Sequence, residues 1–294
     1  MRRWSLVLFV VVAMAAAARL SAQKQGQLFV SLTSADGTPI DGLTANDVTI
    51  SEDGVNCATA RVEAISWPTK LQVLVDNGRS NTSPINPLRD GLTQFFAQIP
   101  DGVEMSLYVT AGTPRNIVKP TTDKQKLIAG IGLLGSDGGA GMFFDALSEA
   151  GERIDKDKTP NFPIIVMVGS DFGNVRVLDR DYLKLQETII NKGVVTHVIV
   201  TVGGTGGATS GGTQVDMGLN LTKMSGGRFE NISTSTRLAT LLPEIAARIA
   251  ESVKRQSHQY RVTYERPAKP SAAPSIGATI RREGVVRISL HGNQ

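Results

Sequence analysis

The hydrophobic pattern of the chain changes character near residue 68. From there to about residue 256, short apolar runs alternate with longer segments whose apolar residues recur at helical spacing. The apolar runs predict strands at 71–75, 105–111, 163–171, 194–202 and 228–232. The helical spacing predicts helices at 87–99, 123–134, 143–154, 181–193 and 235–256. This series predicts an α/β domain over 68–256, with a doubly wound, mostly parallel sheet covered by helices on both faces.

The flanks of this domain have a different pattern. Residues 26–66 contain clustered or alternating β-formers separated by turn sequences, and no helical period is visible there. Beyond the domain, two strand-like runs at 258–267 and 284–291 are separated by a Pro/Ala/Ser linker. Neither flank has enough strands to be stable alone. We therefore expect segments 23–67 and 257–294 to combine into one small β-module.

Residues 1–22 have the layout of a secretory signal peptide. Arg2 and Arg3 precede an apolar run, and small residues follow as far as Ala22. The run is shorter than the roughly 20 apolar residues that span a membrane comfortably, so we expect cleavage and no stable membrane span afterwards. A retained anchor is the alternative. The mature protein would reside in the periplasm, at the cell surface or outside the cell.

Charge and cysteine content exclude some functions. Without Arg2, Arg3 and Arg19, the chain has 28 basic residues against 27 acidic ones, so its basic balance comes largely from the leader. No basic stripe with interleaved aromatic residues is present, which argues against nucleic-acid binding. The single cysteine, Cys57, has no intramolecular partner, and we expect it to be buried.

Two of the predicted strands end in an acid. Asp76 follows the run LQVLV, and Asp171 ends the run PIIVMVGSD. These runs are the most hydrophobic of the domain, so we expect the two strands to be central and adjacent. Ligands of open α/β sheets bind outside the carboxyl ends of the strands, where the strand order reverses. Two carboxylates facing one crevice repel each other and favour a hard cation such as Mg²⁺, which prefers oxygen ligands.

Four stretches within 68–256 resemble the von Willebrand factor type A domain. They are LVDNGRS, GMFFDAL, VMVGSDFG and MSGGRFEN. The resemblance implies a Rossmann-like fold, a non-catalytic protein-binding role and a metal-ion-dependent adhesion site. In that family the site consists of Asp-x-Ser-x-Ser, a Thr on a second loop and an Asp on a third. The flanking β-segments resemble those of a group of exported bacterial von Willebrand A-related proteins.

The adhesion-site motif is incomplete in this chain. Asp76, Ser80 and Asp171 match three of its positions, whereas Gly78 and Gly141 stand where the family has hydroxyl ligands. Two interpretations stay open. The three matching residues would hold Mg²⁺ or another divalent cation with the help of additional waters. Otherwise the site is a relic, and Asp76 caps the strand or pairs locally.

Three neighbouring residues bear on this choice. Ser136 or Asp137 would supply the missing oxygen ligands. Arg79, inside the motif, would instead neutralise the acids as an internal ion pair and displace the metal.

Other chemical signals are weak. The glycine-rich segment 202–213 lacks the lysine and the spacing of a phosphate-binding loop. Ser170 does not fit a nucleophile elbow, which requires a glycine two residues before the serine, where this chain has Val168. His197, His258 and His291 are far apart and form no metal-binding pair. We therefore expect no enzymatic activity.

The sequence as a whole predicts an exported, non-enzymatic, adhesion-type protein that binds a protein partner. Any metal dependence would be carried by Asp76, Ser80 and Asp171, and the resemblance implies that the partner would then supply an acidic ligand. The alternative is a structural or assembly scaffold with a vestigial metal site. The binding edge would present loops near 77–83, 136–142, 172–179 and 203–213.

Overall fold

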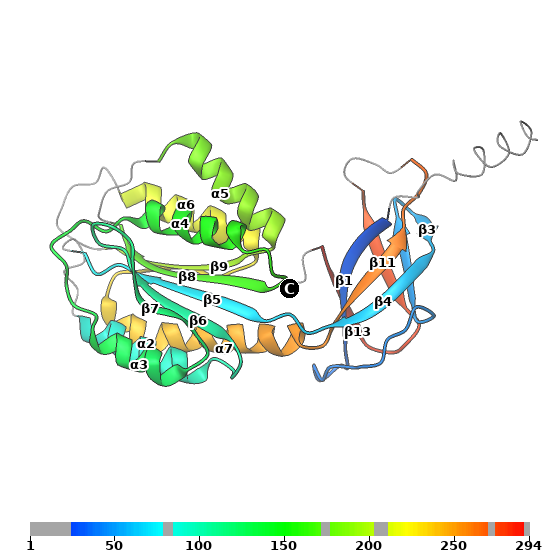
Figure 1. Ribbon diagram of the computed structural model, residues 1–294, viewed down its shortest axis with the longest axis horizontal. Helices are drawn as coiled ribbons and strands as arrows, with labels where there is room; N and C mark the ends of the chain where they lie inside the picture. The colour runs from blue at the N-terminus through cyan, green and yellow to red at the C-terminus, as the bar shows by residue number, and fades with distance from the viewer. Residues whose placement is uncertain (1–24, 79–84, 172–176, 203–210, 270–273, 291–294) are drawn as a thin grey trace, which may run out of the picture.

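The computed structural model describes residues 25–78, 85–171, 177–202, 211–269 and 274–290. The chain forms an α/β domain and a β-module that lie end to end (Figure 1). The predicted leader, together with Arg79 and Ser80 of the adhesion-site motif, lies outside the described residues. None of the described helices combines the length and the apolar character that crossing a membrane requires.

The α/β domain is built on one six-stranded sheet, in the order β10-β9-β8-β5-β6-β7. All neighbouring strands are parallel except the edge strand β7, which pairs antiparallel with β6. The prediction of a doubly wound, mostly parallel sheet is confirmed. The strands are β5 (Thr69–Val75), β6 (Glu104–Val109), β7 (Arg115–Thr121), β8 (Phe162–Ser170), β9 (Val195–Thr201) and β10 (Phe229–Ile232).

Helices cover both faces of this sheet (Figure 1). One face carries α2 (Ile85–Gln98), α3 (Lys124–Gly132) and α7 (Leu238–Gln256), the last preceded by a 3₁₀ turn at Ser235–Arg237. The other face carries α4 (Phe143–Lys156), α5 (Asp179–Lys192) and α6 (Gly211–Ser225). Two hydrophobic cores result, and together they fix the positions of the strand ends.

Local sequence accounts for several helix ends. The first turn of α4 contains Asp145 and its last turn contains Arg153 and Lys156, an arrangement that complements the helix dipole. Helix α5 ends at Gly193, whose φ of 60° closes the helix in a left-handed conformation that glycine adopts without strain.

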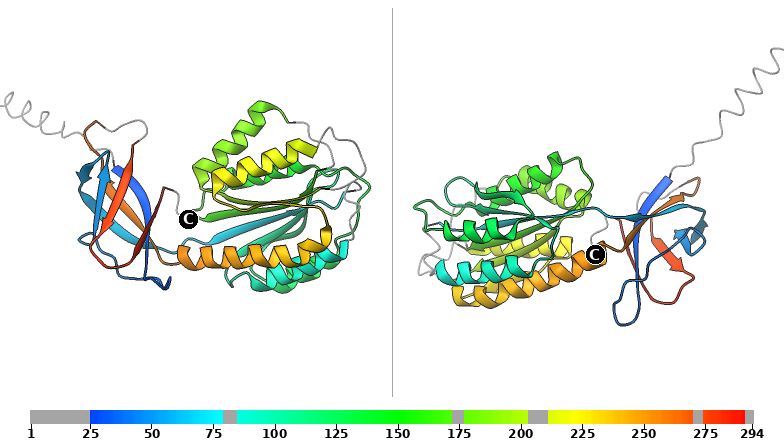
Figure 2. Two further views of the ribbon diagram at one scale, coloured as in Figure 1. Left: turned by 180° about the vertical axis from the view of Figure 1, so that it is seen from behind. Right: turned by 60° about the horizontal axis from the view of Figure 1, so that its bottom comes forward.

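The β-module joins the two ends of the chain, as expected. Strand β1 lies between β13 and β11, and β11 also pairs with β4. A second sheet has the order β12-β2-β3. Figure 2 shows the β-module from two further sides. The strands are β1 (Gln25–Thr33), β2 (Val48–Glu52), β3 (Val55–Cys57), β4 (Thr59–Ile65), β11 (Gln259–Glu265), β12 (Ile276–Ile280) and β13 (Val285–Ser289). Cys57 is half-buried at the end of β3 rather than fully buried, because it lies at the margin of the module's core.

An aromatic cluster joins the two units. Trp67 packs edge-on against Phe29 of the β-module at a centroid distance of 5.1 Å and, in a tilted arrangement, against Phe162 of β8 at 5.6 Å. Since β5 begins immediately after this junction, the parallel strands run away from the module and their carboxyl ends lie at its far side (Figure 1). The edge that binds ligands in this class of sheet therefore faces away from the β-module.

Candidate functional site

The two acids lie at the carboxyl ends of adjacent central strands. Asp76 follows β5 and its backbone N–H donates to Val168 of β8, with an N–O distance of 2.8 Å. Asp171 follows β8 and donates to Thr201 of β9 at 3.0 Å. The chain leaves β5 toward β6 on one side, whereas β8 lies on the other, so the strand order reverses here. The two acids thus occupy the switch point of the sheet.

The Asp76 carboxylate is enclosed and accepts hydrogen bonds from neutral donors. The side chain is 2% exposed. Its Oδ1 accepts a hydrogen bond from the Gly78 backbone N–H at 2.8 Å, and its Oδ2 accepts one from the Ser170 hydroxyl at 2.6 Å. Burial raises the pKa of Asp76, and these hydrogen bonds oppose the rise only in part.

The two glycines of the incomplete motif pack directly against this carboxylate. A Cβ added at Gly141 would lie 2.6 Å from both Cγ and Oδ1 of Asp76. A Cβ added at Gly78 would lie 2.8 Å from the Gly141 nitrogen and 3.0 Å from Asp76 Oδ1. Neither glycine has a positive φ, so the need for glycine here is steric. The side chain of Asp76 fills the space that side chains at these two positions would occupy.

The loop between α3 and α4 closes over the site and is held by Asn77. The Asn77 side chain donates to the Gly135 carbonyl at 2.9 Å, and its backbone carbonyl accepts from the Asp137 N–H at 2.7 Å. Farther along, the Met142 N–H donates to the Thr110 carbonyl at the end of β6. These bonds place Gly141 against Asp76.

Sequence reasoning missed the roles of Asn77 and Ser170. Asn77 directly follows the first acid, and Ser170 directly precedes the second. A small polar residue next to an acid at a buried strand end is the signal that would have identified both.

The suggested substitute ligands are engaged elsewhere or exposed. The Asp137 carboxylate pairs with Arg115 at 3.1 Å and accepts the Gly139 N–H at 3.0 Å. These contacts, the hydrogen bond from Gly139 first, lower the pKa of Asp137. Ser136 is exposed on the same loop.

The described residues do not fit a divalent-cation centre. Mg²⁺ requires a near-octahedral set of oxygens. Both oxygens of Asp76 already accept protein hydrogen bonds, and Gly78 and Gly141 supply no side-chain oxygen. Within the described ranges, no group of three His, Cys, Asp or Glu residues is arranged to hold a metal. Because Ser80 lies outside these ranges, the assignment of Asp76, Ser80 and Asp171 as metal ligands stays a prediction.

The described contacts of the other sequence candidates include no serine–histidine pair. Ser170 donates to Asp76, so a carboxylate and not a histidine is its neighbour. His197 lies inside β9, and His258 pairs with Asp41 at 2.9 Å on the surface of the β-module. His291 and most of the glycine-rich segment 202–213 lie outside the described residues.

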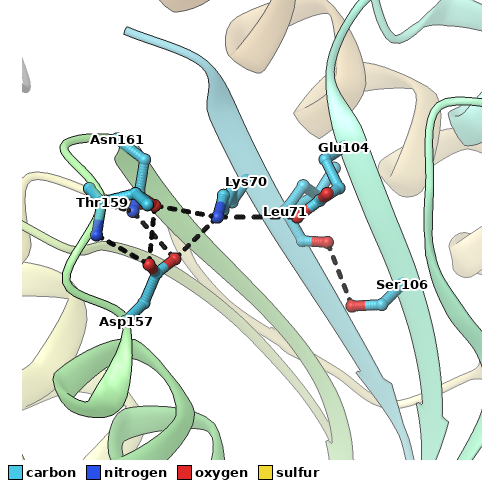
Figure 3. Close-up of polar contacts among 7 residues, drawn as sticks. All are labelled: Lys70, Leu71, Glu104, Ser106, Asp157, Thr159 and Asn161. Atoms are coloured by element: carbon cyan, nitrogen blue, oxygen red, sulfur yellow. Dashed lines mark hydrogen bonds and ion pairs between the residues drawn. The ribbon is translucent and has the colours of Figure 1, made fainter.

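A second polar cluster lies at the opposite end of β5 (Figure 3). Lys70 pairs with Asp157 at 2.7 Å and approaches Glu104 at 3.9 Å, and its ammonium also donates to the Thr159 hydroxyl. Lys70, Glu104 and Asp157 line a cavity of about 230 Å³. Because the lysine is already neutralised by two acids, the cluster acts as a link between β5 and the loop that precedes β8.

Comparison with known proteins identifies the fold of the α/β domain. No protein-family model and no curated protein matches the chain. A von Willebrand factor type A structure from Catenulispora acidiphila is similar, with 9% identity, 92% of this chain and 73% of that chain covered, and a TM-score of 0.51. The pilus adhesin SpaC from Lactobacillus rhamnosus GG, in its open conformation, is also similar, with 12% identity and a TM-score of 0.51. That likeness covers 72% of this chain and 34% of the adhesin. The α/β domain has the von Willebrand factor type A fold.

Proposed function

We propose that this chain, whose α/β domain has the von Willebrand factor type A fold, is an exported, non-enzymatic protein that binds another protein through the carboxyl edge of its sheet. The observation that carries the proposal is the convergence of Asp76 and Asp171 at the switch point between β5 and β8. Sheets of this kind bind their ligands at that point.

The position of this edge also supports a binding role. The edge lies at the far end from the β-module, so neither unit covers it (Figure 1). The described part of the α3–α4 loop lies there, and loops held on a rigid sheet are common binding elements. The structurally similar SpaC is itself a pilus adhesin.

A non-enzymatic role is consistent with the groups at this edge. Among the described residues, Ser170 is the nucleophile nearest to Asp76, and its hydroxyl donates to that carboxylate. Asp76 is a base within reach of this hydroxyl, but a nucleophile must also be accessible to its substrate, and Ser170 and Asp76 are only 3% and 2% exposed. The geometry of Asp76 is that of a buried acceptor enclosed by glycines.

Cross-linking from defined surface positions tests the proposal. A photoreactive amino acid would be placed at exposed Ser136 on the carboxyl edge, with controls at Lys156 near the opposite edge and at Val55 on the β-module. In the native cells, we expect one protein adduct from position 136 alone. It should disappear when Asp171→Ala is added and persist with Glu187→Ala, which removes an exposed acid on α5.

The alternative function is a structural or assembly scaffold. The closed Asp76 site favours it, because both carboxylate oxygens are used internally. A scaffold would give adducts from Val55 or Lys156, and these would be unaffected by Asp171→Ala. That outcome would refute binding at the carboxyl edge.

Metal dependence is a separate prediction with its own test. Calorimetric titration of residues 23–294 with Mg²⁺, Mn²⁺ and Ca²⁺ would give saturating heat if Asp76, Ser80 and Asp171 hold a cation, and Asp171→Ala would abolish it. An absence of heat at millimolar metal would mean that any binding at this edge is metal-independent.

Export is tested by fractionation. Cells expressing the full chain should yield a protein that begins at Gln23 in the periplasm or medium, as measured by N-terminal sequencing. An intact N-terminus in the membrane fraction would instead establish the retained anchor.

A further inference from the structure

A small cavity lies beneath the sheet at the amino ends of β8 and β9, on the face covered by α7. Its volume is about 110 Å³. Helix α7 contributes Arg248, Ser252 and Arg255, whose spacing of four and three residues places them on one side of the helix. His197 of β9 and Ser225 at the end of α6 line the opposite side.

The histidine of this cavity is a fixed neutral donor. His197 is 3% exposed, and its Nδ1 accepts a hydrogen bond from the Arg228 backbone N–H at 3.1 Å. An accepting Nδ1 places the proton of the neutral ring on Nε2. Burial first, and then the charges of Arg248 and Arg228, lower the pKa of His197 to about 4. At neutral pH the imidazole therefore offers an N–H and no charge.

The charge around the cavity is positive. The described residues that line it include two arginines and no acid. Burial lowers the pKa of Arg255, and the nearby charges of Arg287 and Arg248 lower it further, against the opposing effect of Glu251. A guanidinium whose pKa is lowered by burial and by neighbouring arginines lies where an added negative charge would be stabilised.

We propose that this cavity binds a small tetrahedral oxyanion, of which inorganic phosphate and sulfate are the free forms. The polar side chains that line it are Arg248 and Arg255, each with several N–H donors, together with Ser225, Ser252 and His197. Guanidinium groups match the geometry of such oxygens in a bidentate manner.

The size of the cavity agrees with this ligand. A single water needs roughly 10–15 Å³ on the same measure of volume, so a cavity of about 110 Å³ has room for a group larger than one water. A central atom with four oxygens is such a group. A nucleotide or a peptide would not fit inside and would reach the cavity only with a terminal phosphate or sulfate group.

The test uses residues 23–294 and inorganic phosphate, sulfate and chloride at equal ionic strength. Calorimetry and thermal unfolding should show saturable binding and a raised Tm with phosphate or sulfate, and neither effect with chloride. Arg248→Gln should weaken binding by about 10- to 100-fold, the equivalent of one charge-assisted hydrogen bond. Arg248 is exposed, so this variant is expected to fold. Lys254→Gln, an exposed charge on the same helix, is the matched control and should bind like the parent.

An NMR signal from His197 shows whether the phosphate binds in this cavity. The Nε2–H resonance of His197 should shift on addition of phosphate in the parent and stay unchanged in Arg248→Gln. Binding that does not saturate, equals that of chloride, or is unaffected by Arg248→Gln would overturn the proposal. These outcomes are independent of partner capture at the carboxyl edge, because the cavity lies at the other end of the strands.

Discussion

Two buried carboxylates, one in each unit of the molecule, are stabilised in opposite ways. Glu52 in the β-module is 0% exposed and receives three hydrogen-bonding contacts from Arg266, the shortest at 2.6 Å, and one from the Tyr264 hydroxyl at 3.1 Å. Asp76 at the sheet edge is 2% exposed, and the donors described for it include a backbone N–H and a serine hydroxyl, both of them neutral. Both acids are buried to a similar degree, so burial alone does not distinguish them.

The difference lies in the charge of the donor. The Arg266 hydrogen bonds hold the pKa of Glu52 below its usual range, whereas burial raises the pKa of Asp76. Glu52 also affects a neighbour, since burial first and then Glu52 raise the pKa of Tyr264 to about 12. A positively charged partner makes a buried acid a structural link. Neutral donors leave it a group that favours protonation in the folded state.

The largest effect is expected from filling the space beside Asp76. In Gly141→Ala, the new Cβ would overlap the Asp76 carboxylate, and we expect a loss of about 2–3 kcal/mol, because overpacking a closed site forces atoms apart. Thermal unfolding should show a decrease in Tm of roughly 5–10 °C. Gly138→Ala is the control, since no atom lies within 4 Å of its added Cβ.

A double-mutant cycle tests whether overlap with Asp76 causes the loss of stability in Gly141→Ala. Adding Asp76→Ala should recover much of the loss caused by Gly141→Ala, because the overlapping atoms are gone. Additive losses would show that the glycine is required for another reason.

The second largest effect on stability is expected from removing the charge of Glu52, the acid that pairs with Arg266. Glu52→Gln keeps the shape of the side chain and removes its charge, so the bonds from Arg266 lose their charge assistance. We expect the free energy of unfolding to fall by about 2 kcal/mol, measured by urea denaturation. Glu63→Gln is the control, because its pairs with Arg61 and Arg261 are at the surface, where such pairs contribute little.

The two acids should also give opposite dependences on pH. For Glu52, whose folded pKa lies below its usual 4.5, the unfolded chain binds more protons just below that pH. Its contribution to stability is therefore present above pH 4.5 and is lost as the pH falls through the folded pKa. For Asp76, whose folded pKa lies above its usual 3.8, the folded chain binds more protons in the window between the two values. Stability then decreases as the pH rises through that window.

The variant Asp76→Asn isolates the contribution of Asp76 to the pH dependence of stability. The difference in Tm between the variant and the parent should increase as the pH rises from about 4 toward 7, in favour of the variant, and be smaller than the effect of Glu52→Gln. A difference that is flat with pH, or that favours the parent at pH 7, would mean that Asp76 has a positive partner in solution, such as Arg79 or a bound cation.

Much of the fold follows from the sequence, and the exceptions have a common cause. The buried strands β5, β8 and β9 are continuous apolar runs, which is what a parallel sheet covered on both faces requires. The strands that sequence reasoning missed, β7 and β12, are edge strands with mostly exposed or half-buried residues and no clear alternation. An edge strand has little apolar surface to bury, so the sequence carries little signal for it.

The candidate site could be predicted only in outline. Asp76 and Asp171 were identified because each ends a strongly apolar run. Gly78 and Gly141 were visible only as absent ligands, because their packing against Asp76 depends on where three separate loops meet. The cavity under α7 could not be predicted from the sequence. Its polar side chains, His197, Ser225, Arg248 and Arg255, belong to three different elements.

The smallest effect on stability is expected at the buried hydroxyl of Thr110, which has neither a charged nor a neutral hydrogen-bond partner among the described residues. Thr110, just beyond the end of β6, is 0% exposed, and no described residue accepts or donates a hydrogen bond at its hydroxyl. Thr110→Val removes the hydroxyl at nearly constant volume, so we expect stability to rise by about 0.5–1 kcal/mol, since an unsatisfied buried hydroxyl is costly. Ser106→Ala on β6 is the matched control: its hydroxyl donates to the Leu71 carbonyl at 3.4 Å, and its loss should lower stability. If Thr110→Val lowered stability as well, the hydroxyl would have a partner in solution, and the edge beside Asp76 would hold a bound water or ion.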